Sequence, residues 1–291
     1  MPVIGNDVGL AVERIVLATD LSPASEQATQ YAEALAKRYE SKLTLAHVLD
    51  LSAITRSEDA AAGFALEQAR RNSNLEMTQL LERVVQDGVK ATGHSLEARN
   101  PAAAIVKLAA EIDAALIVAG THARHGLTKA ILGSCAEGII RHATCPVVTV
   151  GPKVKPLQDS ILPLARIVFA TDFRSNVEAK ISIALAFAQD AGAQISLLHV
   201  MEHPAGDISE SLEMRLKVEA LLEKMIPKSA YDWCDPECVI EEGNATEHIR
   251  DLAKRKRADL IILGARQSSS WLTHLNDGVV GSLLREAECP V

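Results

Sequence analysis

Apolar and polar positions along the chain follow two spacings, which separate short buried strands from amphipathic helices. Ile15 to Ala18 is a continuous apolar run, as expected for a strand that is buried on both faces of a parallel sheet. A helix is predicted to begin at Ser22-Pro23, with apolar residues at helical spacing: Ala28, Tyr31, Ala32, Leu35, Ala36 and Tyr39. Further strand patterns cover residues 43–49, 116–119 and 146–150, and a long helix with Leu80, Leu81, Val84 and Val85 precedes another strand. This alternation predicts βαβ units and a parallel sheet.

The whole pattern occurs twice. Residues 14–20 return almost unchanged as residues 166–172, and the His-Val pair of residues 47–48 returns at residues 199–200, both at an offset of 152. Residues 116–120 and the Cys-Pro-Val of residues 145–147 return at an offset of 144. The second copy is therefore eight residues shorter between its second strand and its third strand or the helix that follows. We interpret this as the duplication of one domain.

Residues 152–163 separate the two copies and contain Pro152, Pro156 and Pro163, which predicts a stiff, irregular linker. The expected domains are residues 1–151 and 164–291. The expected fold class is α/β, with two tandem open parallel-sheet sandwich domains that are five-stranded and Rossmann-like. The last strand of the second domain is expected to be truncated, because the sequence reaches Val291 where that strand begins.

Composition and charge narrow the classes of function. Only 3% of the residues are aromatic although 48% are hydrophobic, so the core must consist mainly of Ala, Val, Ile and Leu. The net charge of −8 argues against a nucleic-acid or anionic-membrane partner. The basic run of residues 254–257 falls at a predicted helix end, where cations complement the helix dipole. With no apolar signal core in residues 1–13 and no apolar stretch of membrane-spanning length, we expect a cytoplasmic protein.

Candidate binding residues follow the predicted strands, where an open parallel sheet binds its ligands. Thr19 and Asp20 follow the first strand, Val48 and Asp50 end the second, and a loop of residues 120–126 follows the fourth. A helix then begins near Gly133, Ser134 and Cys135, after a loop that contains the cations Arg124, His125 and Lys129. Glycines and a helix N-terminus together can bind a phosphate group. The alternative is an ordinary glycine turn followed by a Ser-capped helix.

The spacing from Gly120 to Gly133-Ser134 resembles the G-x2-G-x9-G-(S/T) loop of the universal stress protein family. The resemblance extends to both copies through the Thr-Asp after the first strand, the His-Val of the second strand and the Cys-Pro-Val after the loop helix. The chain therefore looks like a tandem universal stress protein. The resemblance implies a site for ATP, with Mg²⁺ as a potential companion ion, between the ends of the first and fourth strands. The implied nucleotide-binding residues are Thr19, Asp20 and Val48 beside the adenosine, and Gly120, His122, Ala123, Gly133, Ser134 and Cys135 beside the phosphates.

Two features depart from the family pattern. Ala123 stands where the family has its second loop glycine, and alanine tolerates fewer backbone angles than glycine. In the second copy, the offset of 144 places Asp277-Gly278 opposite Gly133-Ser134. A carboxylate at a helix head would repel phosphate, although Asp277 could instead cap its own helix. We expect the second domain to bind no nucleotide and to pack on the first as a pseudo-dimer partner.

Several residues keep two interpretations. Asp20 either binds the ribose or adenine, or stabilises the turn after the first strand, since Asp172 occupies the same place in the copy expected not to bind. His47 and His199 are expected to be core histidines. Cys234 and Cys238 are four residues apart without a second pair, so neither a metal site nor a redox pair is expected. No P-loop, dinucleotide, zinc-protease or serine-hydrolase motif occurs.

The sequence supports one function best and leaves two alternatives. The first is a stress-response protein that binds ATP in its N-terminal domain and changes its association with an unknown protein partner. The second is a scaffold that binds no nucleotide and acts through protein contacts. The third, a slow ATP hydrolase, would need a group that positions water. His122, His125 and Asp50 are the candidates for that role, but their spacing specifies none of them, so no catalytic residue is assigned.

Overall fold

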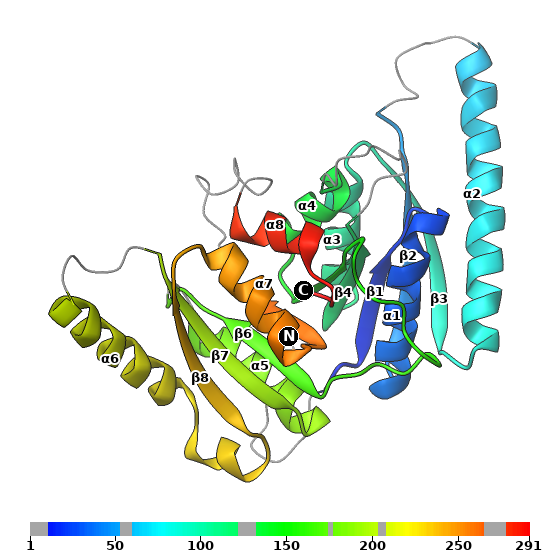
Figure 1. The fold of residues 1–291 in the computed structure, drawn as a ribbon. Helices are drawn as coiled ribbons and strands as arrows, with labels where there is room; N and C mark the ends of the chain where they lie inside the picture. Colours follow the sequence, from blue (N-terminus) through cyan, green and yellow to red (C-terminus); the bar gives the residue numbers. More distant parts are fainter. Residues whose placement is uncertain (1–10, 53–59, 122–131, 174–176, 203–207, 265–277) are drawn as a thin grey trace. The chain divides into compact units, whose positions relative to one another are not determined.

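The computed structural model describes residues 11–52, 60–121, 132–173, 177–202, 208–264 and 278–291. The chain divides into two compact units (Figure 1), each described here by itself. Unit 1 comprises Ala11–Pro152 and Pro156–Leu162, and unit 2 includes Lys153–Lys155 and Pro163–Val291. Each unit contains one parallel sheet with helices on both faces, which confirms the predicted fold class.

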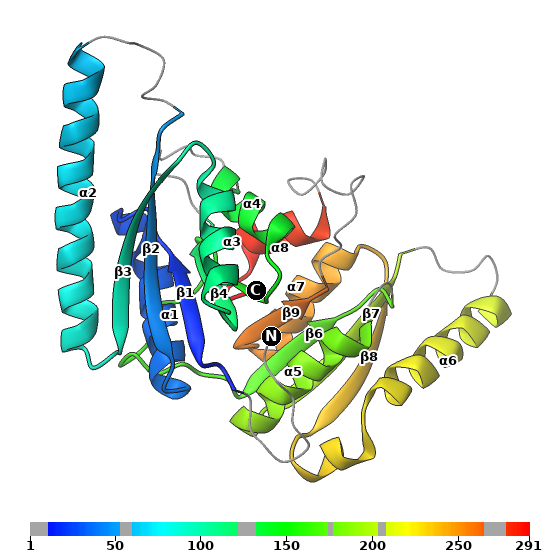
Figure 2. The same cartoon turned by 180° about the vertical axis from the view of Figure 1, so that it is seen from behind.

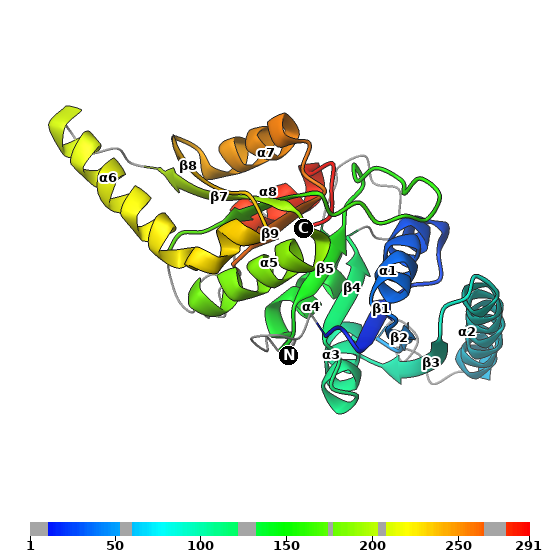
Figure 3. The ribbon, with the colours of Figure 1, turned by 90° about the horizontal axis from the view of Figure 1, so that it is seen from below.

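Unit 1 has a five-stranded sheet in the order β3-β2-β1-β4-β5. Its strands are β1 (Arg14–Ala18), β2 (Lys42–Asp50), β3 (Ala91–Ala98), β4 (Leu116–Gly120) and β5 (Val147–Val150). Its helices are α1 (Glu26–Arg38), α2 (Ala60–Gln86), α3 (Pro101–Glu111) and α4 (Ser134–His142), with a short 3₁₀ turn, η1 (Pro23–Ser25), before α1. Helices α1 and α2 lie on one face of the sheet, and α3 and α4 lie on the other (Figure 3).

The strand order of unit 1 reverses beside β1, whose neighbours are β2 on one side and β4 on the other. Helices α1 and α4, which follow β1 and β4, lie on opposite faces of the sheet. Such a reversal point is where an open parallel sheet can form a binding crevice at the carboxyl ends of its strands. Because both faces are covered, β1 and β4 are buried along nearly their whole length. Val16, Ala46 and Ile117 belong to the core that packs against α3.

Unit 2 has a four-stranded parallel sheet in the order β8-β7-β6-β9. Its strands are β6 (Arg166–Ala170), β7 (Gln194–Met201), β8 (Pro236–Glu242) and β9 (Leu260–Leu263). Its helices are α5 (Val177–Ala191), α6 (Ile208–Met225), α7 (Ala245–Lys256) and α8 (Val279–Glu286), with a 3₁₀ turn, η2 (Lys228–Asp232), after α6. Helix α5 packs on β6 and β7, and α7 packs on the opposite face (Figure 2).

The last strand of unit 2 is incomplete, as the sequence predicts. Ile261 N donates a hydrogen bond of 3.0 Å to Pro290 O, as Ile117 N does to Pro146 O at 3.0 Å in unit 1. The residues that follow Pro146 continue as β5, whereas no fifth strand is present in unit 2 among the described residues.

The strand register shows where unit 2 is shorter than unit 1 by eight residues. Leu43 pairs with Ala91, 48 residues later, whereas the equivalent Ile195 pairs with Pro236, 41 residues later. Seven of the eight residues are therefore lost between the second and third strands of unit 2. Helix α2 spans 27 residues and α6 only 18, so the shortening falls mainly on this helix.

The helical segment begins at Ser22 and Pro23 as predicted, but its first turn is a 3₁₀ helix. Ser22 and Pro23 begin the 3₁₀ turn η1, and α1 itself begins at Glu26. Ser22 makes no capping bond, because its hydroxyl donates to Asp20 instead.

Candidate functional site

The carboxyl ends of β1 and β4 meet the head of α4. Ala18 pairs with Ala119, so both strands end at the same level of the sheet. Thr121 N then donates to Val150 O at 3.1 Å, and Gly133 N donates to Thr121 O at 3.1 Å. The second bond returns the chain to the strand end, which brings Gly133 beside the end of β4 and thus near Gly120.

The first turn of α4 carries no side-chain cap. Gly133 is the N-cap residue, in an extended conformation, and Ser134 is the first helical residue with an exposed side chain. The alternative of a Ser-capped helix is therefore wrong, because the residue at the capping position has no side chain. Of the first four N–H groups of the helix, that of Gly133 donates to Thr121 O, and the first bond within the helix runs from Glu137 N to Gly133 O at 2.9 Å. The N–H groups of Ser134, Cys135 and Ala136 therefore have no acceptor within the helix. These groups and the helix dipole make this turn suited to an anion.

Thr19 and Asp20 form a tight corner after β1. Thr19 Oγ1 accepts a hydrogen bond from Leu21 N at 3.0 Å and lies 3.0 Å from Ser25 Oγ. Asp20 Oδ1 accepts bonds from Ser22 N at 3.0 Å and Ser22 Oγ at 2.6 Å. Leu21, which lies between Asp20 and Ser22, has a φ of 60°. This left-handed conformation is energetically unfavourable for a residue with a side chain. The turn role considered for Asp20 is thus present, and Thr19 is 6% exposed, so its side chain serves the corner.

His47 bonds to the main chain of this corner. Its ring Nδ1 lies 3.0 Å from Thr19 O, and the side chain is only 5% exposed. In unit 2 His199 Nδ1 lies 2.8 Å from Thr171 O, so each histidine makes the same hydrogen bond to the carbonyl of the Thr that follows the first strand. His47 is a core histidine as expected; His199 is only partly buried, although it makes the same contact.

Carboxylates from two strand ends act on the head of α4. The pKa of the Cys135 thiol is raised to about 11, first by burial and then by the negative charges of Asp20 and Asp50. A helix N-terminus ordinarily lowers a thiol pKa, so burial and the two carboxylates outweigh that effect here. The crevice therefore combines anion-attracting N–H groups with two nearby negative charges.

Val48 and Gly120 contribute main chain rather than side chains. The Val48 side chain is buried in the core on the α3 face. The ladder between β1 and β2 ends at Ala46, so the main chain of Val48 continues past the end of β1. A Cβ atom on Gly120 would meet only Ala28 Cβ at 3.7 Å, an ordinary contact. Nothing among the described residues requires glycine at that position.

Part of the expected site lies outside the described residues, namely His122, Ala123 and the cations Arg124, His125 and Lys129. The described part of the chain contains no group of three or more metal-ligating side chains. It also contains no helix that is long and apolar enough to cross a membrane.

The head of α8 in unit 2 differs from the sequence alignment by one residue. Gly278 is the N-cap residue and Val279 the first helical residue, so the capping position, held by Gly133 in α4, falls to Gly278 rather than Asp277. The interpretation of Asp277 as the helix cap was therefore wrong, and Asp277 itself lies outside the described residues.

Some residues of the site were missed in the sequence. Ser22 and Ser25 complete the corner, and His47 fixes its carbonyl. The signal for His47 was present, because the Thr-Asp and His-Val pairs recur at one common offset in both copies. For the serines no such signal exists, since the offset of 152 places Arg174 and Val177 at their positions in the second copy.

The chain thus contains two open parallel α/β sheets, each with a helix whose N-cap residue is glycine, Gly133 in unit 1 and Gly278 in unit 2. The model of the universal stress protein family matches residues 11–151 and 164–291, so the chain belongs to that family as a tandem pair. A protein of Staphylococcus saprophyticus assigned to the universal stress proteins is 32% identical over 171 residues, which are 58% of this chain and 99% of that protein.

Solved structures agree with this assignment. A universal stress protein from Archaeoglobus fulgidus covers 96% of this chain and 95% of its own, with 20% identity and a TM-score of 0.68, which shows the shared fold. Another from the same organism was solved in complex with dAMP and covers 48% of this chain and 98% of its own, with 24% identity and a TM-score of 0.35. A TM-score this low supports no argument about ligands of this chain.

Proposed function

We propose that unit 1 binds an adenine nucleotide, ATP, in the crevice between the carboxyl ends of β1 and β4. The observation that carries the proposal is the bond from Gly133 N to Thr121 O, which sets the uncapped turn of α4 beside Gly120. Phosphate groups are the ligands that such a turn favours. A ligand that approaches the main chain closely would also supply a reason for glycine at position 120, which no contact among the described residues requires.

Each part of the crevice has a role in this proposal. Main-chain groups of Val48 contact the adenine, and the carboxylate of Asp20 accepts hydrogen bonds from the ribose. Gly133, Ser134 and Cys135 offer their N–H groups to the phosphates, with His122 and Ala123 on the same side by family resemblance. Thr19 holds the corner that places Asp20, rather than contacting the nucleotide itself.

The charges of the crevice favour a companion cation. Asp20 and Asp50 both raise the pKa of Cys135 at the head of α4, so their negative charges lie near the turn proposed to bind the phosphates. Carboxylates and phosphate oxygens are the ligands that Mg²⁺ prefers, and an ion shared between them would remove their mutual repulsion. We therefore expect ATP to bind more tightly with Mg²⁺ than without it.

The rest of the proposal concerns the whole chain. Unit 2 binds no nucleotide and serves as the pseudo-dimer partner of unit 1, and nucleotide occupancy changes association with a protein partner in the cytoplasm.

Hydrolysis of ATP lacks comparable support. Of its candidate residues only Asp50 lies within the described residues, where its Oδ1 accepts a bond from Ser52 N at 2.8 Å. A scaffold without nucleotide remains the outcome if binding fails.

Nucleotide content tests the proposal. The full chain would be purified without added ligand and denatured, and the released adenine nucleotide quantified by chromatography, followed by ATP titration of the emptied protein. About one nucleotide per chain is expected, because only unit 1 has the site. Neither released nucleotide nor binding in the titration would contradict the proposal and favour the scaffold.

The matched variants are Gly133→Asp and Gly63→Asp. Aspartate is a good N-cap residue, so Gly133→Asp should keep α4 folded while its carboxylate takes the N–H groups and repels phosphate. Gly63 in α2 is exposed with no atom within 4 Å of an added Cβ, so Gly63→Asp controls for the charge alone. Binding should be lost in the first variant and retained in the second.

A further inference from the structure

Unit 2 has a lysine where its nucleotide crevice would be. Gly264 follows β9, at the position of Gly120 after β4. A Cβ atom placed on Gly264 would lie 2.7 Å from Lys180 Nζ, 2.8 Å from its Cδ and 3.1 Å from its Cε. Distances this short mean that the end of the lysine side chain lies directly against the main chain of Gly264.

In unit 1 the equivalent position is occupied by a small side chain. Lys180 lies in the first turn of α5, and its equivalent at the offset of 152 is Ala28 in α1. Ala28 is the one residue near a Cβ on Gly120 among the described residues, at 3.7 Å. The two units therefore present the same glycine at the strand end, covered by a lysine side chain in unit 2 and by a methyl group in unit 1.

We propose that Lys180 closes the strand-end crevice of unit 2 and is the residue that prevents nucleotide binding there. The stem atoms Cδ and Cε cover the glycine, and the ammonium occupies the volume at the carboxyl end of β9. This inference gives a physical cause for a domain without nucleotide that does not depend on Asp277. It rests on the proposed function of unit 1 only in the first of the two tests that follow.

The first test transplants the lysine into unit 1. Ala28→Lys in the full chain is expected to weaken ATP binding about tenfold or more in calorimetric titration, since the added side chain fills the crevice. The matched control is Ala24→Lys, which adds the same charge at an exposed position of η1. That variant is expected to bind as the unchanged protein does. Unchanged or tighter binding by Ala28→Lys would overturn the proposal, and tighter binding would indicate that a lysine there receives the phosphates instead.

The second test needs no nucleotide and remains decisive if Ala28→Lys fails to fold or if unit 1 proves not to bind ATP. The full chain would be treated briefly with an amine-acetylating reagent, and the acetylation rate of each lysine measured by peptide mass spectrometry. Lys217, whose side chain is 64% exposed, and Lys254 on α7 serve as references within unit 2. Lys180 is expected to react several times more slowly than both. Reaction at the same rate would show that its ammonium is not lodged in the crevice.

Discussion

The two units share their corner but differ in the space beside it. Thr171 Oγ1 accepts from Phe173 N at 3.0 Å, as Thr19 Oγ1 does from Leu21 N, and Phe173 has a φ of 57° where Leu21 has 60°. The corner is thus a property of the framework and not evidence of a ligand. What separates the units is Lys180 against Gly264, in contrast to the small Ala28 beside Gly120. The difference in binding that we propose therefore depends on the side chain beside the strand-end glycine and not on the Thr-Asp pair.

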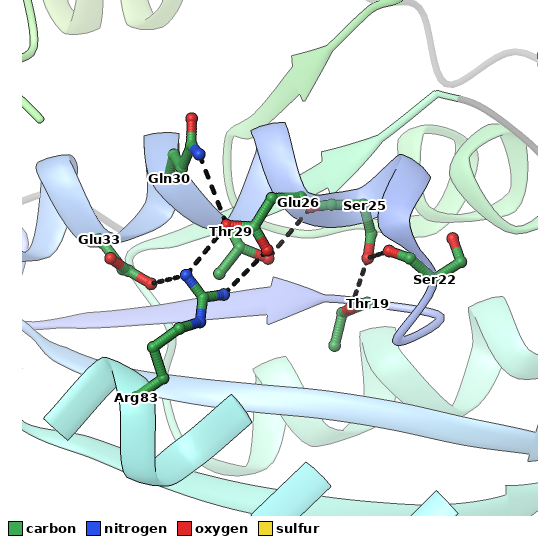
Figure 4. A network of polar contacts seen from close by, with 8 residues as sticks. All are labelled: Thr19, Ser22, Ser25, Glu26, Thr29, Gln30, Glu33 and Arg83. Carbon is green, nitrogen blue, oxygen red and sulfur yellow. Dashed lines mark hydrogen bonds and ion pairs between the residues drawn. The ribbon is translucent and has the colours of Figure 1, made fainter. Parts of the chain in front are cut away.

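The first helix of each unit shows a second contrast. In unit 1, Arg83 of α2 bonds both carboxylate oxygens of Glu26 at 2.9 Å and lies 3.8 Å from Glu33 Oε1 (Figure 4). Glu33 is 4% exposed, and its Oε1 has no hydrogen-bond partner within the described structure. Its equivalent in α5 at the offset of 152 is Leu185, which is 6% exposed. Unit 1 therefore keeps a buried carboxylate where unit 2 has an apolar contact.

The largest effect is expected where unit 1 depends on a glycine that unit 2 lacks. A Cβ on Gly138 would lie 2.5 Å from Ala102 Cβ, so α3 and α4 approach too closely for any side chain. Unit 2 has Ser282 at the equivalent position. Gly138→Ala should lower the free energy of unfolding by about 2 kcal/mol, measured by urea unfolding. Gly63→Ala, in open space, should instead leave stability unchanged or raise it by up to about 1 kcal/mol. Equal stability of both variants would argue against the close helix contact.

Arg83→Met should lower the free energy of unfolding by about 1 to 2 kcal/mol, because it leaves Glu33 buried without its nearest positive charge. Urea unfolding again provides the measurement. The double variant Glu33→Leu/Arg83→Met, which makes this position of unit 1 resemble unit 2, should recover most of that loss. A double variant as unstable as Arg83→Met would show that Glu33 is not the source of the cost.

Glu33→Leu alone should raise the free energy of unfolding by up to about 1 kcal/mol at pH 7, because the pKa of Glu33 is raised by burial, against the opposing charge of Arg83. A carboxyl whose pKa is raised on folding favours the folded state below its unfolded pKa and loses that contribution as the pH rises through its folded pKa. The advantage of Glu33→Leu over the unchanged protein should therefore shrink as the pH falls from 7 toward 4.5. An advantage that grows over this range would contradict the expected direction of the pKa shift.

The smallest expected effect concerns the thiol at the head of α4. Asp20→Asn removes one of the charges that raise the pKa of Cys135, so this pKa should fall and the alkylation rate of Cys135 at pH 8 should rise. Peptide mass spectrometry after treatment with iodoacetamide measures the rate. Asp172→Asn, the same change in unit 2, should leave the rate at Cys135 unaltered. A similar increase in both variants would mean that Asp20 does not act on this thiol directly.

Local patterns in the sequence were sufficient for the strands, the duplication and the incomplete last strand, because each depends on spacing along the chain. The head of α8 was placed one residue too early, because an alignment by offset cannot register that α8 begins one residue later than α4.

Other features were not predictable because they join distant segments. Glu33 reads in the sequence as one more polar position of an amphipathic helix, and it becomes buried only where α1 and α2 lie together on the sheet. Lys180 and Gly264 are likewise far apart along the chain, and only the placement of α5 over the end of β9 brings them into contact. Asp50 and Cys135 are also far apart along the chain, so the effect of the Asp50 charge on the pKa of Cys135 was not predictable either.

The left-handed residue at each corner has a consequence for signalling. Leu21 and Phe173 are held at nearly the same φ in a crevice proposed to be open and in one proposed to be filled. A ligand shifts a conformational equilibrium only through an energy difference between the two states, and a conformation that is the same in both offers none. We therefore expect this corner to keep its conformation when a nucleotide binds. A change in association is expected to begin instead at the head of α4, a helix that packs closely against α3.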